Sequence, residues 1–183
     1  GYIPAQTIDA AKLGLTKPFD SISDLCYVNG TLYILDSGNG RIVELDEELN
    51  LVAEYSEFVI ADGAGLECRD AFPDGKVTFV GAEGFTVTPD GSLYVADTMN
   101  YRILCFSADR QLTRVIVRPD HVLNNTGAAF DPVKIEADSK GRIYIATNSI
   151  TLGLMVFNED GSFSHFFGAN EVLSTTQAFI KAF

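Results

Sequence analysis

The chain has 183 residues, a length that suits one compact domain with a full hydrophobic core. Its 25 acidic residues outnumber its 13 lysines and arginines, and the net charge of −12 argues against electrostatic capture of nucleic acid or of an anionic membrane. Hydrophobic residues make up 46% of the chain, too many for a disordered protein. No run approaches the ~20 apolar residues of a membrane helix, so we expect no membrane insertion by this segment.

The sequence repeats itself along the chain. Residues 33–45, YILDSGNGRIVEL, align without a gap with residues 94–106, YVADTMNYRILCF, and a weaker third copy occupies residues 144–157. A strand-like run and a tight turn precede each copy, and a turn and an alternating run follow it. A repeated unit of four short antiparallel strands, about 35 to 40 residues long, is typical of a β-propeller blade.

We therefore predict an all-β fold, a partial β-propeller with four-stranded antiparallel blades in a single region that spans residues 1–183. The blade-like units are expected at about residues 18–55, 79–118 and 130–168. Residues 56–78 are polar and acidic and are predicted to be an inserted loop. A capping box that begins at Ser174, followed by apolar residues at helical spacing, predicts a short C-terminal helix at about residues 174–183.

Three blades are too few to close a ring, because closed propellers have about four to eight blades. One expectation is that residues 2–15 and the C-terminal helix cover the open sheet faces. The other is a homodimer in which the exposed blades of two chains meet. The apolar set Phe179, Ile180 and Phe183 favours association or a continuation of the chain outside this segment, because an apolar helix face needs a partner surface.

A polar pattern, D-x-x-N-x-R-I, marks the first two repeats. Its residues are Asp36, Asn39 and Arg41 in the first copy and Asp97, Asn100 and Arg102 in the second. We expect each aspartate to accept backbone N–H bonds across the turn that follows it, and each arginine to reach that carboxylate or a neighbouring blade. Surface recognition by the arginines is the alternative. On this reading Asp97→Ala is expected to cost about 1–2 kcal/mol.

The third copy departs from this pattern. Thr147 replaces the aspartate and Gly153 replaces the arginine, which argues against one uniform ligand-binding role for these positions.

This pattern resembles the NHL repeat of β-propellers over about residues 18–168. More narrowly, the F-x-P-x-K-I run at residues 130–135 and the segment 153–170 are similar to a family of Gram-positive gut bacterial proteins, in which an extracytoplasmic NHL propeller precedes a Yip-type membrane region. The resemblance implies a non-catalytic binding or scaffolding module, extracytoplasmic or at the bacterial cell surface and tethered by a membrane region outside this segment. Its loops would be presented to a protein, peptide or carbohydrate partner.

An enzymatic alternative rests on Glu83-Gly84, which resembles the Glu-Gly of gluconolactonase-type propellers that hold a divalent metal at the channel mouth. The equivalent positions are Asp24 or Ser23 in the first unit and Val133 or Lys134 in the third. Valine or lysine supplies no oxygen ligand for a cation such as Ca²⁺, so a metal-dependent lactonase-like hydrolase stays the alternative and a non-catalytic role is preferred. We expect Asp24, Glu83 and Lys134 at the channel mouth, Glu83 as the one candidate metal ligand, and otherwise no cofactor.

Overall fold

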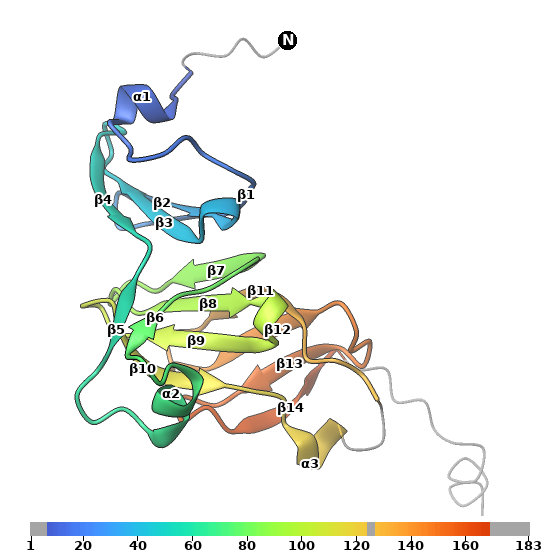
Figure 1. Ribbon diagram of the computed structural model, residues 1–183. Coiled ribbons are helices and arrows are strands. Elements are labelled where there is room, and N and C mark those ends of the chain that lie inside the picture. Colours follow the sequence, from blue (N-terminus) through green and yellow to red (C-terminus); the bar gives the residue numbers. More distant parts are fainter. Residues whose placement is uncertain (1–6, 124–126, 169–183) are drawn as a thin grey trace, which may run out of the picture.

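Three β-sheets follow one another along the chain, as the computed structural model shows (Figure 1). The structure describes residues 7–123 and 127–168. The first sheet has its four antiparallel strands in sequence order: β1 (Ile22–Val28), β2 (Thr31–Asp36), β3 (Arg41–Leu45) and β4 (Leu51–Tyr55). The third has the same order: β11 (Pro132–Ala137), β12 (Ile143–Thr147), β13 (Leu154–Phe157) and β14 (Phe163–Phe167).

The second sheet has six strands. Four of them repeat the blade pattern: β7 (Gly84–Val87), β8 (Leu93–Asp97), β9 (Arg102–Phe106) and β10 (Gln111–Ile116). The other two are β5 (Phe58–Ile60) and β6 (Lys76–Val77), and the sheet order is β6-β5-β10-β9-β8-β7. We call the three sheets the first, second and third blades.

The prediction that residues 56–78 form only a loop is wrong. This segment contains β5, helix α2 (Leu66–Ala71) and β6, and β5 pairs parallel with β10 at the outer edge of the second blade. The cause lies in the apolar residues between the charges. Phe58, Cys68, Phe72 and Val77 are buried in the core that the first two blades share, and they anchor the insertion there.

The blades pack face to face, and each interface holds its own hydrophobic core. Between the first and second blades lie, among others, Tyr33, Leu35, Ile42, Phe85, Leu104 and Phe106. Between the second and third blades lie, among others, Ile103, Cys105, Ile135, Ile145, Met155 and Phe157. Because each blade buries one face against the next, the described chain has the stacking of a propeller, and the predicted all-β fold with four-stranded antiparallel blades is confirmed.

The segment that precedes β1 covers the outer face of the first blade. It contains the short helix α1 (Ala10–Leu13), and Leu13, Leu15 and Phe19 pack against a cluster that includes Val43 and Leu45. These two side chains point away from the second blade, so part of the open face that sequence analysis identified is covered from within the chain.

The remaining elements are short. Two 3₁₀ turns, η1 (Ser37–Asn39) and η2 (Thr98–Asn100), connect the second and third strands of the first two blades, and helix α3 (Asp120–Leu123) follows β10. Within the described residues, no helix is long and apolar enough to cross a membrane. The expected helix at residues 174–183 lies outside the described residues.

Candidate functional site

The D-x-x-N-x-R residues of the first blade form a buried polar network. The Asp36 carboxylate is 0% exposed, and its Oδ2 accepts bonds from Arg41 Nε at 2.7 Å and Asn39 Nδ2 at 2.9 Å. Its Oδ1 accepts the backbone N–H of Asp20 at 2.8 Å. Arg41 is 2% exposed and donates a second charged bond to Glu54 Oε2 on β4. The motif thus joins three strands of the blade to the segment that enters it.

The second blade repeats this network. The buried Asp97 carboxylate accepts bonds from Arg102 Nε at 2.8 Å, from Asn100 Nδ2 at 3.0 Å and from the backbone N–H of Val80 at 3.0 Å. The Arg102 guanidinium also lies over the Phe72 ring, 4.3 Å from its centroid. All six motif side chains therefore have partners within the fold.

One detail differs from the sequence prediction. Neither Asp36 nor Asp97 makes a side-chain cap bond to the turn that follows it. The 3₁₀ turns close through their own backbone bonds, such as Gly40 N–H to the Ser37 carbonyl at 3.1 Å. Each carboxylate is therefore free to bind the segment that enters the blade, about sixteen residues earlier in the chain.

The third blade holds the corresponding turn in another way. Asp131, just before β11, accepts the backbone N–H of Ser149 at 2.9 Å and its hydroxyl at 2.6 Å. Thr147, which replaces the aspartate of the motif, accepts the backbone N–H of Ile150 at 3.1 Å. The Asp131–Ser149 contact was not predicted from the sequence. The Asp-Pro dipeptide at the start of β11 was the one signal that could have indicated it.

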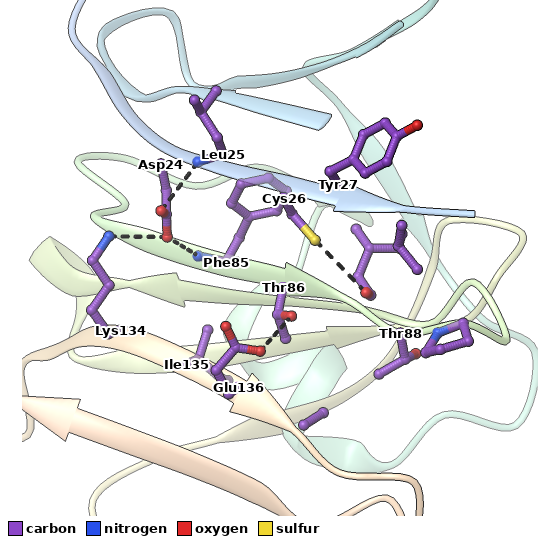
Figure 2. Close-up of a pocket in the computed structure, with 14 residues that line it drawn as sticks. Asp24, Leu25, Cys26, Tyr27, Phe85, Thr86, Thr88, Lys134, Ile135 and Glu136 are labelled. Carbon is purple, nitrogen blue, oxygen red and sulfur yellow. Dashed lines mark hydrogen bonds and ion pairs between the residues drawn. The ribbon is translucent and has the colours of Figure 1, made fainter. Parts of the chain in front are cut away.

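The innermost strands of the three blades, β1, β7 and β11, lie next to one another and line a pocket of about 440 Å³ (Figure 2). We call it the inner-strand pocket. Its lining residues are Asp24, Leu25, Cys26, Tyr27, Val28, Phe85, Thr86, Val87, Thr88, Pro89, Lys134, Ile135, Glu136 and Ala137.

At one end of the pocket the three residues expected at the channel mouth come together. Lys134 Nζ lies 3.0 Å from Asp24 Oδ2 and donates to the backbone carbonyl of Glu83 at 3.3 Å. Asp24 Oδ2 also accepts the backbone N–H of Phe85 at 3.2 Å (Figure 2). The Glu83 side chain itself is exposed.

Close approach of β7 and β11 explains the glycine that follows Glu83. A Cβ atom on Gly84 would lie 2.4 Å from the Val133 carbonyl oxygen, closer than real contacts allow. Because only glycine fits there, the Glu-Gly pair of the sequence has a packing reason that is independent of any metal.

Farther along the pocket, Thr86 and Glu136 point toward one another, and the Thr86 hydroxyl donates to Glu136 Oε2 at 3.1 Å (Figure 2). The Cys26 thiol faces the Val87 carbonyl with a sulfur–oxygen distance of 3.8 Å. Glu136 is exposed while Thr86 is buried, so the carboxylate is presented to the open part of the pocket.

The donor set around Asp24 and Glu83 does not fit a divalent metal. Across residues 7–123 and 127–168, no group of three or more His, Cys, Asp or Glu side chains is placed to hold a metal ion. Asp24 Oδ2 already accepts from the Lys134 ammonium and from the Phe85 N–H. A metal site needs several converging oxygen ligands, and here the third blade supplies an ammonium, which repels a cation.

Comparisons with known proteins agree with this architecture. Residues 79–106 match the family described as NHL repeat. The chain is similar to hydrazine synthase of Kuenenia stuttgartiensis, with a TM-score of 0.55 and 14% identity over 92% of this chain and 40% of that chain. It is also similar to virginiamycin B lyase from Staphylococcus aureus, solved as an inactive variant with quinupristin, with a TM-score of 0.54 and 14% identity over 84% of this chain and 44% of that chain.

No curated protein sequence matches the chain. At 14% identity the two structural neighbours show the fold alone, and the chain spans less than half the length of each of them. The family match and the neighbours together support an NHL-repeat β-propeller.

Proposed function

We propose that this chain is a non-catalytic binding or scaffolding module, whose inner-strand pocket and surrounding loops take a protein, peptide or carbohydrate partner. The observation that carries the proposal is the position of Lys134. Its ammonium bonds to Asp24 and to the Glu83 carbonyl, at the place where a metal-dependent propeller enzyme would need converging oxygen ligands.

The lactonase-like hydrolase is the alternative, and the geometry favours it less. Such an enzyme uses its metal to polarise the substrate carbonyl, which requires a cation with an open coordination position. Here the Asp24 carboxylate is neutralised by Lys134, and the neighbouring position on β11, Val133, supplies only a backbone carbonyl that packs against Gly84. A polar pocket with its own internal ion pair suits recognition better than metal catalysis.

The location of the module belongs to the same proposal. An extracytoplasmic or cell-surface position, with a membrane tether outside this segment, is supported by the resemblance of residues 130–135 and 153–170 to the Yip-associated propellers. The net charge of −12 supports partners that are not nucleic acids.

Metal titration and a lactone assay test the proposal. We expect that Ca²⁺, Mg²⁺ and Zn²⁺ leave the melting temperature of the chain unchanged, and that glucono-1,5-lactone is hydrolysed no faster than in buffer. We also expect at least one ligand from peptide and oligosaccharide arrays to bind saturably, and Lys134→Gln in the pocket to change its affinity. Glu48→Gln, in the exposed turn between β3 and β4, is the control that should leave affinity unchanged.

Two results would overturn the proposal. Lactone turnover that EDTA and Glu83→Gln both abolish would establish the hydrolase. Binding that neither pocket variants nor loop variants affect, or no binding at all, would reject a module that acts through this face.

A further inference from the structure

Glu136 carries a negative charge that the fold does not neutralise. Its carboxylate is exposed in the inner-strand pocket and accepts one hydrogen bond, from the neutral Thr86 hydroxyl at 3.1 Å. Among the ion pairs of the described residues, none reaches Glu136. The carboxylate is therefore held in place by Thr86 while its charge remains available to a ligand.

The other carboxylate of the pocket is already used. Asp24 Oδ1 accepts the backbone N–H of Leu25 at 3.1 Å, and its Oδ2 accepts from Phe85 N–H and from Lys134. The charges of Asp24 and Lys134 cancel, so the lining of the pocket has a net charge of −1, which Glu136 carries. The Asp24–Lys134 ion pair thus forms a neutral end of the pocket, and the uncompensated carboxylate lies next to it, at the Thr86–Glu136 pair (Figure 2).

We propose that the inner-strand pocket binds an arginine side chain of a peptide partner, with the guanidinium on Glu136. The inference rests on the proposed binding function and names its ligand chemistry. A guanidinium presents a planar fork of N–H donors that matches a carboxylate, and it is more weakly hydrated than an ammonium. The net charge of −12 draws cationic peptides to the chain at long range.

The dimensions of the pocket are consistent with this occupant. Its volume of about 440 Å³ lies within the range of roughly 300–1,000 Å³ that is usual for ligand pockets and leaves room for a side chain and part of its backbone. Lys134 and Glu136 are two residues apart on β11, so their Cα atoms are about 6.5 Å apart and the guanidinium need not contact the ammonium.

Nuclear magnetic resonance titration of the whole 183-residue chain tests the inference. The probe is N-acetyl-Gly-Arg-Gly-amide, and the matched neutral probe replaces arginine by citrulline, which has nearly the same shape. We expect saturable shifts of the Thr86 and Glu136 amide signals with the arginine peptide, and binding at least about tenfold weaker with citrulline, as loss of a charge-assisted bond implies. Affinity should fall as NaCl is raised from 20 to 300 mM.

Two variants with opposite expected effects sharpen the test. Glu136→Gln keeps the side-chain volume and removes the charge, so arginine binding should weaken about 10- to 100-fold. Lys134→Gln removes the repelling ammonium and releases Asp24, so arginine binding should strengthen. Glu48→Gln changes the net charge by the same amount outside the pocket and should alter affinity less than twofold. Melting curves verify that each variant is folded.

Equal binding of the arginine and citrulline peptides, or unchanged affinity in Glu136→Gln, overturns the inference. If a neutral peptide or an oligosaccharide then binds with shifts at the pocket, the proposed module stands and only its ligand chemistry is wrong. Signal shifts confined to residues outside the pocket overturn the inference as well.

Discussion

Lys134 Nζ lies 3.0 Å from Asp24 Oδ2, so a side chain of the third blade forms an ion pair with the first blade across the inner strand of the second. The backbone N–H of Phe85, on that middle strand, donates to the same carboxylate oxygen at 3.2 Å. Asp24 is therefore the point at which all three inner strands are joined. Lys134 supplies only the outermost of these bonds, since its side chain is 56% exposed.

This asymmetry predicts that substitution of Asp24 lowers the free energy of unfolding more than substitution of Lys134 does. Asp24→Ala removes the acceptor of two backbone N–H groups as well as the ion pair and should lower the free energy of unfolding by about 1–3 kcal/mol. Lys134→Met removes one half-exposed partner and should cost less than about 1 kcal/mol. Urea midpoints at unchanged m-values measure both. Equal losses in the two variants would show that the ion pair, and not the amide bonds, carries the stability.

The buried motif predicts a larger effect. Asp97 is 0% exposed and accepts bonds from Val80, Asn100 and Arg102, so Asp97→Ala would leave the Arg102 guanidinium, 15% exposed, without its counter-charge. From the sequence alone, Asp97→Ala was expected to lower the free energy of unfolding by about 1–2 kcal/mol. The buried ion pair raises the expected loss to about 3–5 kcal/mol, because the substitution leaves a charged partner unpaired. Asp109→Ala, at an exposed turn, is the matched control and should cost less than about 0.5 kcal/mol. Chemical denaturation compares them, and similar losses would contradict a buried role for Asp97.

The blade pattern could be predicted because its signals are local. Residues 33–45 and 94–106 align without a gap, and the tight turns that precede them contain Gly30 and Gly91, which adopt positive φ without strain. Alternation, repetition and these turns therefore indicate β2–β3 and β8–β9 without knowledge of the rest of the fold. The parallel pairing of β5 with β10 is different, because it joins residues about fifty positions apart and β5 has only three residues.

The candidate site could be predicted only in part. The sequence indicated that Asp24, Glu83 and Lys134 occupy equivalent positions in the repeats. The bond between Lys134 and Asp24 depends, however, on the angle between successive blades, which the sequence pattern does not give. The Thr86–Glu136 pair was missed for the same reason, since the two residues are fifty positions apart and belong to different blades. Repeat alignment places residues at the same level of different blades and does not say which of them touch.

Acid should remove one local contribution to stability. Asp138, in the turn between β11 and β12, has a pKa of about 2 in the folded chain. Desolvation raises this pKa, but the hydrogen bonds from the Arg142 side chain and from the N–H groups of Lys140 and Arg142 outweigh that effect and lower it. Because the folded pKa lies below the unfolded value of about 3.9, the stabilisation is fully present above about pH 4 and is lost as pH falls through 2.

The difference in unfolding free energy between the parent chain and Asp138→Asn should therefore be constant from pH 7 to about pH 5 and shrink toward zero near pH 2. Urea denaturation across this series measures it. A difference for Asp138→Asn that grows on acidification would contradict a lowered pKa.

Backbone strain at the end of η2 predicts a stabilising substitution. Tyr101 adopts a left-handed φ of 55° and is 57% exposed, whereas the equivalent residue of the first blade is Gly40 with a φ of 59°. Tyr101→Gly should raise stability by up to about 1 kcal/mol, because relief of about 1–2 kcal/mol of strain exceeds the entropy cost of glycine. Thermal melts measure the change, and a loss larger than about 1 kcal/mol would show that the Tyr101 side chain makes stabilising contacts.

The reverse substitution is the matched test. Gly40→Tyr introduces the same strain, and a Cβ atom at this position would lie 2.9 Å from the Phe79 carbonyl oxygen. It should therefore destabilise the chain by at least about 1–2 kcal/mol. A neutral Gly40→Tyr would mean that strain at this position does not limit stability.

The two ends of the blade stack predict how chains would associate. Leu13, Leu15 and Phe19 cover the outer face of the first blade, whereas Leu154 and Phe167, paired across β13 and β14, are 38% and 57% exposed on the third. A homodimer should therefore form through the third blades, as a two-fold pair in which the same face meets itself.

Light scattering over a concentration series should show the mass rising from 19.9 toward about 40 kDa. Phe167→Ser should keep the chain monomeric, while Val52→Ser, at an equally exposed valine of β4, should not. A particle that stays near 20 kDa at every concentration and melts cooperatively would reject the dimer.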